Sequence, residues 1–263
     1  MSKKTISMCQ GKGSLSHNNR DFTAKNIDSS RTADNIVFVR QDLGETYHQL
    51  FGGAVERYNV RQKRNDRKIS DYFQHLFNRE PNASVITGAN KQKNFYGDLV
   101  QIGTKDDTGV GTPDAENSVE CLREYMDGFQ SRNPNFYVFN AVMHLDEATP
   151  HLHIDYIPIG HFTSGLDTRN AMAKALEEMG FGKGANAINR WQCLNGKSCA
   201  ISARLMGLKF LNRRSPEDTV LPRRNMASIK TKSMLLKRKK QRHWQSGMMP
   251  VPSWKRHQNR EPS

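Results

Sequence analysis

The sequence predicts an α+β fold, an α/β sandwich whose sheet is largely antiparallel. Residues 136–143 are rich in aromatic and β-branched side chains and lack glycine and proline, which predicts a buried strand. Residues 151–159 alternate polar and apolar side chains, which predicts a second strand. Only a short turn-like segment, 146–150, separates the two, so we expect an antiparallel hairpin. Strand and helix patterns alternate along the rest of the chain, as is typical of this class.

The other elements follow from the spacing of apolar residues and from turn chemistry. We expect further strands at four places: 4–10, 35–41, 82–87 and 98–103. We expect helices, each with apolar residues on one side, at four others: 46–59, 69–77, 114–132 and 166–179. The last of these has Asp167 or Thr168 as a candidate N-cap and Gly180 in the position that favours a glycine C-cap.

The hairpin carries a candidate metal site. His151, His153 and Asp155 are two residues apart on one strand and therefore share a face of the sheet. His144 ends the neighbouring strand, from which its side chain can lean over the same face. Three converging imidazoles that leave coordination positions open predict a divalent-metal site of the catalytic type.

Two other metal sites fit this segment less well. The spacing excludes the H-E-x-x-H pattern of a zinc-binding helix. His144 and Asp146 could begin the facial triad of an oxygenase, but that site would not require both His151 and His153 beside it. A metal-dependent oxygenase or hydrolase of a small substrate also lacks a substrate-pocket pattern to accompany the histidines.

Charge is distributed unevenly along the 263 residues, whose formal net charge is +14. Residues 1–189 contain 22 lysines and arginines against 23 aspartates and glutamates, whereas residues 190–263 contain 18 against 3. The excess therefore lies entirely in the C-terminal part and indicates a polyanionic partner. The four cysteines show no C-x-x-C spacing, and neither a signal peptide nor an 18-residue apolar run is found, so we expect a cytoplasmic protein.

A candidate nucleophile lies far upstream of the hairpin. His17 is carried on a Gly/Ser/Asn-rich segment, with Asn18 and Arg20 beside it. A neutral imidazole is nucleophilic near pH 7, and Arg20 or Arg31 could clamp a phosphate. A metal-bound water would suffice for simple hydrolysis, whereas a protein nucleophile gives a covalent intermediate that permits rejoining.

Three segments in this order carry a family resemblance. They are His17-Asn18-Asn19-Arg20, then Asn26-Ile27-Asp28-Ser29-Ser30-Arg31-Thr32, then His144-Leu145-Asp146-Glu147-Ala148-Thr149-Pro150-His151-Leu152-His153. Together they resemble the motifs of the MobV (Mob/Pre) plasmid mobilisation and recombination relaxases. The H-x-D-E-x-x-P-H-x-H pattern is the most specific of the three. The resemblance extends from the N-terminus to about Trp191 and not beyond.

This resemblance implies an HUH-endonuclease-like fold, with a central antiparallel sheet and flanking helices. It implies a bacterial enzyme that nicks one strand of plasmid DNA at a transfer origin, presented as a single strand or hairpin. Mn²⁺ or Mg²⁺ would be bound by His144, His151 and His153, without a small-molecule cofactor. His17 would capture the 5′ phosphate as a phosphoramidate and could later rejoin the strand.

The resemblance also implies roles for several other residues. Glu147 would be catalytic, orienting His17 or the metal ligands, although a carboxylate in a turn needs no such role. Asn18, Arg20 and Arg31 would contact DNA, as would two arginines of a later basic cluster, Arg61 and Arg64. Other relaxase families use tyrosine as nucleophile. Residues 17–39 contain none, which favours His17 and leaves Tyr47 as the weaker alternative.

Domain organisation is predicted from composition and from where the resemblance ends. Residues 1–190 form the expected relaxase domain, and residues 191–263 form a basic tail that is disordered or only partly helical. Family members usually continue into a long helical region, which this tail does not resemble. It is either a nucleic-acid-binding tail or the product of a disrupted gene. The second case suggests an alternative function, a truncated and catalytically impaired DNA-binding remnant.

Overall fold

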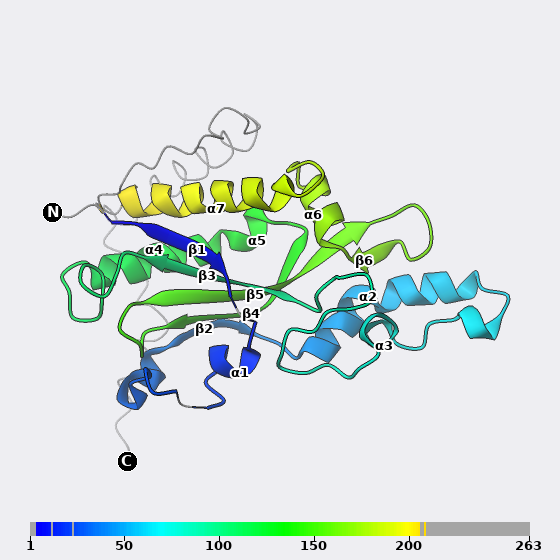
Figure 1. Cartoon of the computed structure of the whole chain (residues 1–263), viewed down its shortest axis with the longest axis horizontal. Coiled ribbons are helices and arrows are strands. Elements are labelled where there is room, and N and C mark those ends of the chain that lie inside the picture. The colour runs from blue at the N-terminus through cyan, green and yellow to red at the C-terminus, as the bar shows by residue number, and fades with distance from the viewer. Residues whose placement is uncertain (1–3, 12, 23, 206–207, 209–263) are drawn as a thin grey trace, which may run out of the picture. The chain divides into compact units, whose positions relative to one another are not determined.

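In the computed structural model, the residues described are 4–11, 13–22, 24–205 and 208. They belong to one compact unit, Met1–Arg214, built around an antiparallel sheet with helices on both faces (Figure 1). This confirms the α+β class that the sequence predicts. The main strands lie in the order β1 (Ile6–Gln10), β3 (Tyr96–Ile102), β5 (His151–His161), β4 (Phe136–His144) and β2 (Ile36–Arg40).

The predicted hairpin is the centre of this sheet. β4 and β5 pair antiparallel, with His144 opposite His151 and Val142 opposite His153. β5 is buried along almost its whole length, because it has a neighbour on each side and helices or loops on both faces. The sheet therefore brings the two ends of the histidine pattern to adjacent positions on one face.

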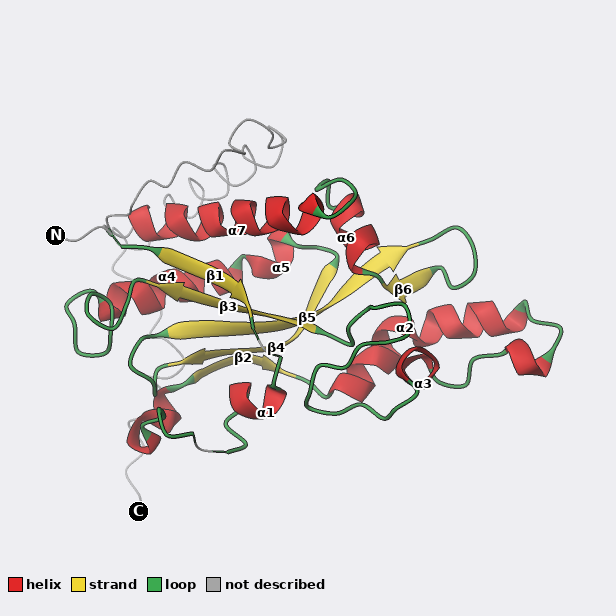
Figure 2. Ribbon diagram, in the orientation of Figure 1, coloured by secondary structure: helices red, strands yellow, loops and turns green. Residues whose placement is uncertain are grey.

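One face of the sheet is covered by three helices, α4 (Ala115–Asp127), α5 (Phe129–Arg132) and α7 (Asn186–Leu205) (Figure 2). Trp191 of α7 packs edge-on against Phe136 of β4, and Phe136 stacks on Tyr156 of β5. Gly128 separates α4 from α5, where the sequence predicts one continuous helix at 114–132.

The opposite face bears the histidines, and an aromatic core covers its other end. α2 (Leu43–Val60) and α3 (Tyr72–Phe77) contribute this core, which includes Tyr47, Phe51 and Phe73. Leu15 of the short helix α1 (Leu15–Asn18) belongs to the same cluster. Hydrophobic packing thus holds α1 against the face on which the histidines lie. Two short 3-10 helices, η1 (Ser29–Asp34) and η2 (Asn65–Arg67), complete the elements before β3.

Two of the predicted elements are wrong for reasons of tertiary structure. Residues 82–87 form no strand, because their backbone bonds go to residues 13–15 and to the Asn94 side chain. The predicted helix at 166–179 is divided into β6 (Thr168–Asn170), which pairs with β5, and α6 (Met172–Glu178). Arg57 binds Asp167 at the predicted N-cap, while Gly180 has the left-handed φ of +86° expected beyond a helix end.

The first residues of the predicted tail, 191–205, are helical, which is compatible with a tail predicted to be disordered or only partly helical. α7 crosses the predicted domain boundary at 190, and its buried positions are spaced as on one helical face. Several of these positions carry small or polar residues, among them Asn195, Ser198 and Cys199, so a hydrophobic pattern does not reveal the helix. Residues 209–263, most of the predicted tail, lie outside the described residues. Within the described part of the chain, no helix is long and apolar enough to cross a bilayer.

A buried acid on the helix-covered face gives the fold a predictable pH dependence. Asp98 of β3 is 2% exposed, and burial raises its pKa to about 7 despite a hydrogen bond from Tyr156. An acid whose pKa is higher in the folded state favours unfolding once the unfolded chain ionises. We therefore expect the contribution of Asp98 to the free energy of unfolding to fall as pH rises from about 4 to about 7, by on the order of 2–4 kcal/mol, and then to level off.

Urea denaturation of the wild type and of Asp98→Asn at pH 5 and pH 8 measures this contribution. The difference in unfolding free energy between the two proteins should change with pH in the stated direction. An unchanged difference would show that Asp98 has an ordinary pKa in the folded protein.

Candidate active site

Three imidazole rings of the hairpin form a compact triangle on one face of the sheet. The ring centroids of His144, His151 and His153 lie 4.7–5.1 Å apart, and all three residues are buried. Their shared face and mutual proximity are as the sequence predicts.

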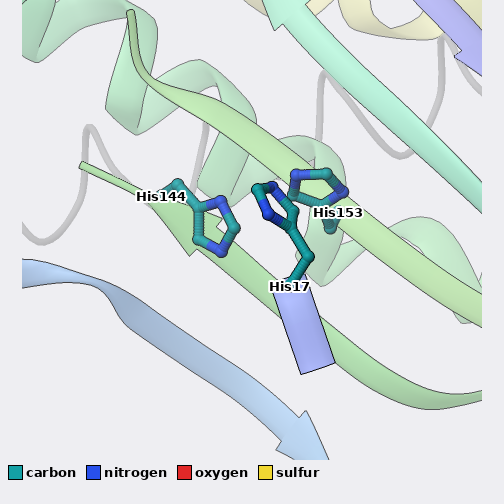
Figure 3. Close-up of side chains that lie close together, drawn as sticks. All are labelled: His17, His144 and His153. Carbon is teal, nitrogen blue, oxygen red and sulfur yellow. The ribbon is translucent and has the colours of Figure 1, made fainter. Parts of the chain in front are cut away.

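His17 reaches this triangle from α1. Ser14 caps the helix by accepting a hydrogen bond from the His17 backbone N–H, and Leu15 anchors the helix in the aromatic core. The His17 ring lies 5.8 Å from the ring of His144 and 5.8 Å from that of His153 (Figure 3). Residues more than 120 positions apart in the chain therefore come together at one site.

The hydrogen bonds of the hairpin histidines leave nitrogen lone pairs inside the triangle. With Nε2 as its donor, His144 bonds to the carbonyl of Asn18 at 2.9 Å, and with Nδ1 as its donor, His151 bonds to the carbonyl of Thr149 at 2.8 Å. The remaining nitrogens, His144 Nδ1 and His151 Nε2, then face each other as acceptors at 3.3 Å. His153 Nε2 is buried and has no hydrogen-bond partner.

Burial keeps the rings of His144 and His153 neutral. It lowers the pKa of His144 to about 4 and that of His153 to about 2, and neighbouring positive or titratable groups add to the effect. Neutral imidazoles that present buried, unshared lone pairs to one another suit a divalent cation. The residues present therefore fit a metal ion.

Two sets of side chains offer ligand atoms that all lie within 4.8 Å of one another. One comprises His17, His144 and His153, and the other comprises His144, Glu147 and His151. The predicted ligand triad combines members of both sets, and His144 belongs to each. His17 is therefore close enough to be a ligand itself, an arrangement that would compete with its predicted role as nucleophile.

Arg20 links α1 to the acidic turn of the hairpin. It adopts a left-handed φ of +58°, and its guanidinium forms two hydrogen bonds to Asp146, at 2.6 and 2.9 Å, and one to Glu147 at 2.8 Å. Burial opposes ionisation of Asp146, but the bonds from Arg20 and Asn35 outweigh it and hold its pKa below the ordinary value. The DNA contact predicted for Arg20 would use a guanidinium already engaged by two carboxylates.

Glu147 lies at the centre of the polar groups. Its Oε1 atom is 3.7–3.9 Å from ring nitrogens of three histidines: His17, His144 and His151. Its Oε2 atom accepts a hydrogen bond from Asn26 at 2.7 Å. This placement is compatible with the orienting role predicted for Glu147.

Arg31 and Asn35 hold the backbone of the turn. Arg31 donates from Nη1 to the carbonyl of Leu145 at 2.8 Å and from Nε to Asp28 at 2.9 Å. Asn35 accepts from the backbone N–H of Leu145 and donates to Asp146. Sequence reasoning predicted a DNA contact for Arg31 and overlooked Asn35, whose position just before a strand gave no sign of this contact.

Asn18 is buried and directed inward. Its Nδ2 donates to Oδ2 of Asp155 at 2.8 Å, and Asn140 donates to the same oxygen at 2.9 Å. Gly97 permits this arrangement, since a Cβ at that position would lie 2.6 Å from Asp155 Oδ1. The structure thus gives Asn18 an internal contact in place of the predicted contact with DNA. Asp155 and Asn140, two polar residues inside buried strands, were the sequence signal for this network.

Exchanging Asn18 and Asp155 tests whether the hydrogen bond between their side chains positions α1. Asn18→Asp sets two carboxylates against each other, and we expect a fall in turnover of about 10- to 100-fold, the range typical of residues that orient a site. Asn18→Asp combined with Asp155→Asn restores a donor–acceptor pair and should recover most of this loss. The turnover rate and the thermal unfolding of each variant should be measured together. A double variant as slow as Asn18→Asp would contradict the positioning role.

The remaining predicted residues lie outside this cluster. Arg61 and Arg64 are exposed at the C-terminal end of α2 and just beyond it, a region well separated from α1 in Figure 1. Arg61 bonds to the Gly165 carbonyl and Arg64 to Asp66, so their contact with DNA stays a prediction. Tyr47 is a core residue whose hydroxyl bonds to Asn94 and Asn170, and burial raises its pKa well above the ordinary value. These contacts count against the tyrosine alternative.

His17 itself is partly exposed. Burial, followed by the neighbouring Arg20, lowers its pKa, so the ring is neutral at pH 7. A neutral, partly exposed imidazole above three buried histidines is able to act as a nucleophile toward a ligand bound between them.

Residues 39–179 match the Mob_Pre family model, described as plasmid recombination enzyme. The chain belongs to the Mob_Pre family of plasmid recombination enzymes. The match covers the hairpin with His144, His151 and His153 and begins downstream of His17. Family membership confirms the resemblance that the sequence motifs indicate.

Solved structures similar to this Mob_Pre protein include the MobM relaxase domain bound to oriT DNA of plasmid pMV158. Two Mn-bound crystal structures of that domain, at pH 5.5 and pH 4.6, have TM-scores of 0.45, with 17% and 16% sequence identity. Each comparison covers 84% of this chain and 95% or 96% of the MobM chain. Comparison with curated proteins gives no significant match.

Proposed function

We propose that this Mob_Pre protein is a relaxase that cuts one strand of plasmid DNA at a transfer origin by covalent capture on His17. The observation that carries the proposal is the contact of the His17 ring with His144 and His153. Phosphodiester cleavage with rejoining requires two components, a nucleophile and a set of neutral side chains that can bind a metal. Both lie on one face of this sheet.

We propose a divalent ion, Mn²⁺ or Mg²⁺, as the cofactor, held by His144, His151 and His153. When bound, it would polarise a phosphoryl oxygen and neutralise the charge that develops on the phosphate. The two facing acceptor nitrogens and the unpartnered Nε2 of His153 support this assignment. The MobM domain, which resembles this chain, is Mn-bound in its complexes with origin DNA.

In the covalent step, the neutral imidazole of His17 attacks the phosphorus atom. If Nε2 carries the proton and faces Glu147, Nδ1 is the attacking atom. The Nδ1–P bond forms as the P–O3′ bond breaks, which leaves the 5′ phosphate on His17 and frees a 3′ hydroxyl. Glu147, 3.9 Å from Nε2, is placed to accept the Nε2 proton and return it to the departing 3′ oxygen. Attack by that hydroxyl on the phosphoramidate reverses the step and rejoins the strand.

Arginines set the position of the DNA in different ways. Arg20 and Arg31 form hydrogen bonds to Asp146 and to the Leu145 carbonyl, so they fix the turn that carries Glu147. Arg61 and Arg64 are proposed as phosphate contacts at a distance from it, where both are exposed.

Incubation of the protein with its supercoiled plasmid, and with single-stranded origin DNA, tests the proposal. With Mn²⁺ we expect nicked plasmid and a protein–DNA band that survives denaturation, and chelation should remove both. A phosphoramidate is labile to acid, whereas a phosphotyrosine ester is not, so brief acid treatment should release the DNA. Salt-sensitive binding without cleavage at any Mn²⁺ concentration would favour the alternative of a DNA-binding remnant.

A further inference from the structure

An exposed aromatic side chain lies beside His17. Phe22 is 51% exposed, and its ring centroid is 6.1 Å from that of His17. The large apolar side chains exposed within the described part of the chain are Phe22, Val37, Val60 and Val110, so Phe22 is the aromatic one among them. An aromatic face left in water next to a nucleophile is a natural contact for a planar group of the substrate.

Local hydrogen bonds fix the backbone on which Phe22 is mounted. The N–H groups of Asn19 and Asp21 donate to the carbonyls of Leu15 and Ser16, both at 2.8 Å. The side chain of Asp21 also accepts from Arg40 of the edge strand β2 at 3.2 Å. Phe22 is therefore presented by a braced turn that continues directly from α1.

The net charge of residues 1–189 favours a contact with DNA that does not depend on charge. Residues 1–189 have a net charge close to zero, and the arginines nearest His17 are engaged, Arg20 by two carboxylates and Arg31 by Asp28 and a carbonyl. Counterion release from phosphates accordingly gives this region limited affinity. Stacking of a base on an aromatic ring supplies affinity that does not depend on charge.

We propose that Phe22 is a stacking platform for the unpaired base beside the phosphate that His17 attacks. The two ring centroids are 6.1 Å apart, so a base next to the phosphate that His17 attacks lies within reach of the Phe22 ring. The edge residue Val37, also exposed, lies on the same sheet face, because it pairs with Val142, which is opposite His153. This inference rests on the proposed function and identifies an unpaired nucleobase as the group recognised.

Two probes of equal charge test the proposal without knowledge of the origin sequence. One is an oligothymidylate of about twelve nucleotides, and the other is an abasic sugar-phosphate strand of the same length. We expect the wild type to bind oligothymidylate about 10- to 100-fold more tightly than the abasic strand, as one or two stacked bases would give. Phe22→Ala should lose most of this preference, whereas Phe22→Trp should keep it.

Controls separate this result from other causes. Val60→Ala removes an exposed apolar side chain on α2 and should leave the preference unchanged. The dependence of log affinity on log salt should be the same in Phe22→Ala and the wild type, because no charge is removed. A wild type that binds both probes equally, or a Phe22→Ala variant that keeps the preference, would overturn the inference. Covalent capture of origin DNA by the wild type is measured in a separate assay. Failure of the relaxase proposal can therefore be distinguished from failure of the stacking proposal for Phe22.

Discussion

His17→Ala is expected to abolish the covalent protein–DNA band and to lower the rate of strand cleavage by on the order of 10⁴-fold or more. Removal of a nucleophile eliminates the route through a covalent intermediate, and side chains that act with it cannot compensate. The His17 side chain is 31% exposed and belongs to a short helix held by Leu15, so its removal should have little effect on folding. Single-turnover cleavage of radiolabelled origin DNA with Mn²⁺ measures the loss.

His48→Ala provides the matched control for this variant. His48 is exposed on α2, outside the site, and its replacement should leave cleavage unchanged. DNA affinity of His17→Ala should stay within a few-fold of the wild type, since the lost step follows binding. Full nicking by His17→Ala would remove His17 from the role of nucleophile.

Removal of the metal site is expected to have a comparable effect. A bound cation contributes several kcal/mol to phosphoryl chemistry, so His144→Ala should slow cleavage by on the order of 10³-fold or more. His144 belongs to both sets of potential ligands and also bonds to the carbonyl of Asn18, which makes it the most informative position. In the wild type, Mn²⁺ at about 100 times its dissociation constant should raise the melting temperature by roughly 5–10 °C.

Calorimetry with and without Mn²⁺ should show no such rise for His144→Ala. His161→Ala is the matched control, because His161 is exposed at the end of β5 and bonds to Glu178 instead of the cluster. His153→Ala provides a second variant if His144→Ala does not fold. A shift in melting temperature that persists in both variants would place the metal elsewhere.

The hairpin was predictable because its information is local. A period of two places His151 and His153 on one face, and a short turn allows only an antiparallel return to His144. The sheet and most of its helices follow from the same kind of periodicity. The residue type and neighbours of His17 made it a candidate nucleophile, and the motif resemblance supported its pairing with the histidine face. No local pattern shows which loop the sheet will bring over the hairpin.

Other features depend on contacts between distant residues and could not be found in the same way. The start of the predicted helix at 166–179 was lost to a strand, because Thr168–Asn170 pair with β5 and Asn170 bonds to the hydroxyls of Tyr47 and Tyr72. α7 was missed because polar and small side chains occupy part of its buried face. The inward bond from Asn18 to Asp155 spans 137 positions, and only the folded sheet shows that the pair meet.

The identity of the residue linked to DNA tests the central claim most directly. The covalent complex formed with origin DNA and Mn²⁺ would be digested with trypsin and nuclease, and the nucleotide-bearing peptide sequenced by tandem mass spectrometry under non-acidic conditions. We predict a single phosphoramidate on His17, within the tryptic peptide that ends at Arg20. Linkage to any other residue, or a nicked plasmid without a linked peptide, would contradict the account.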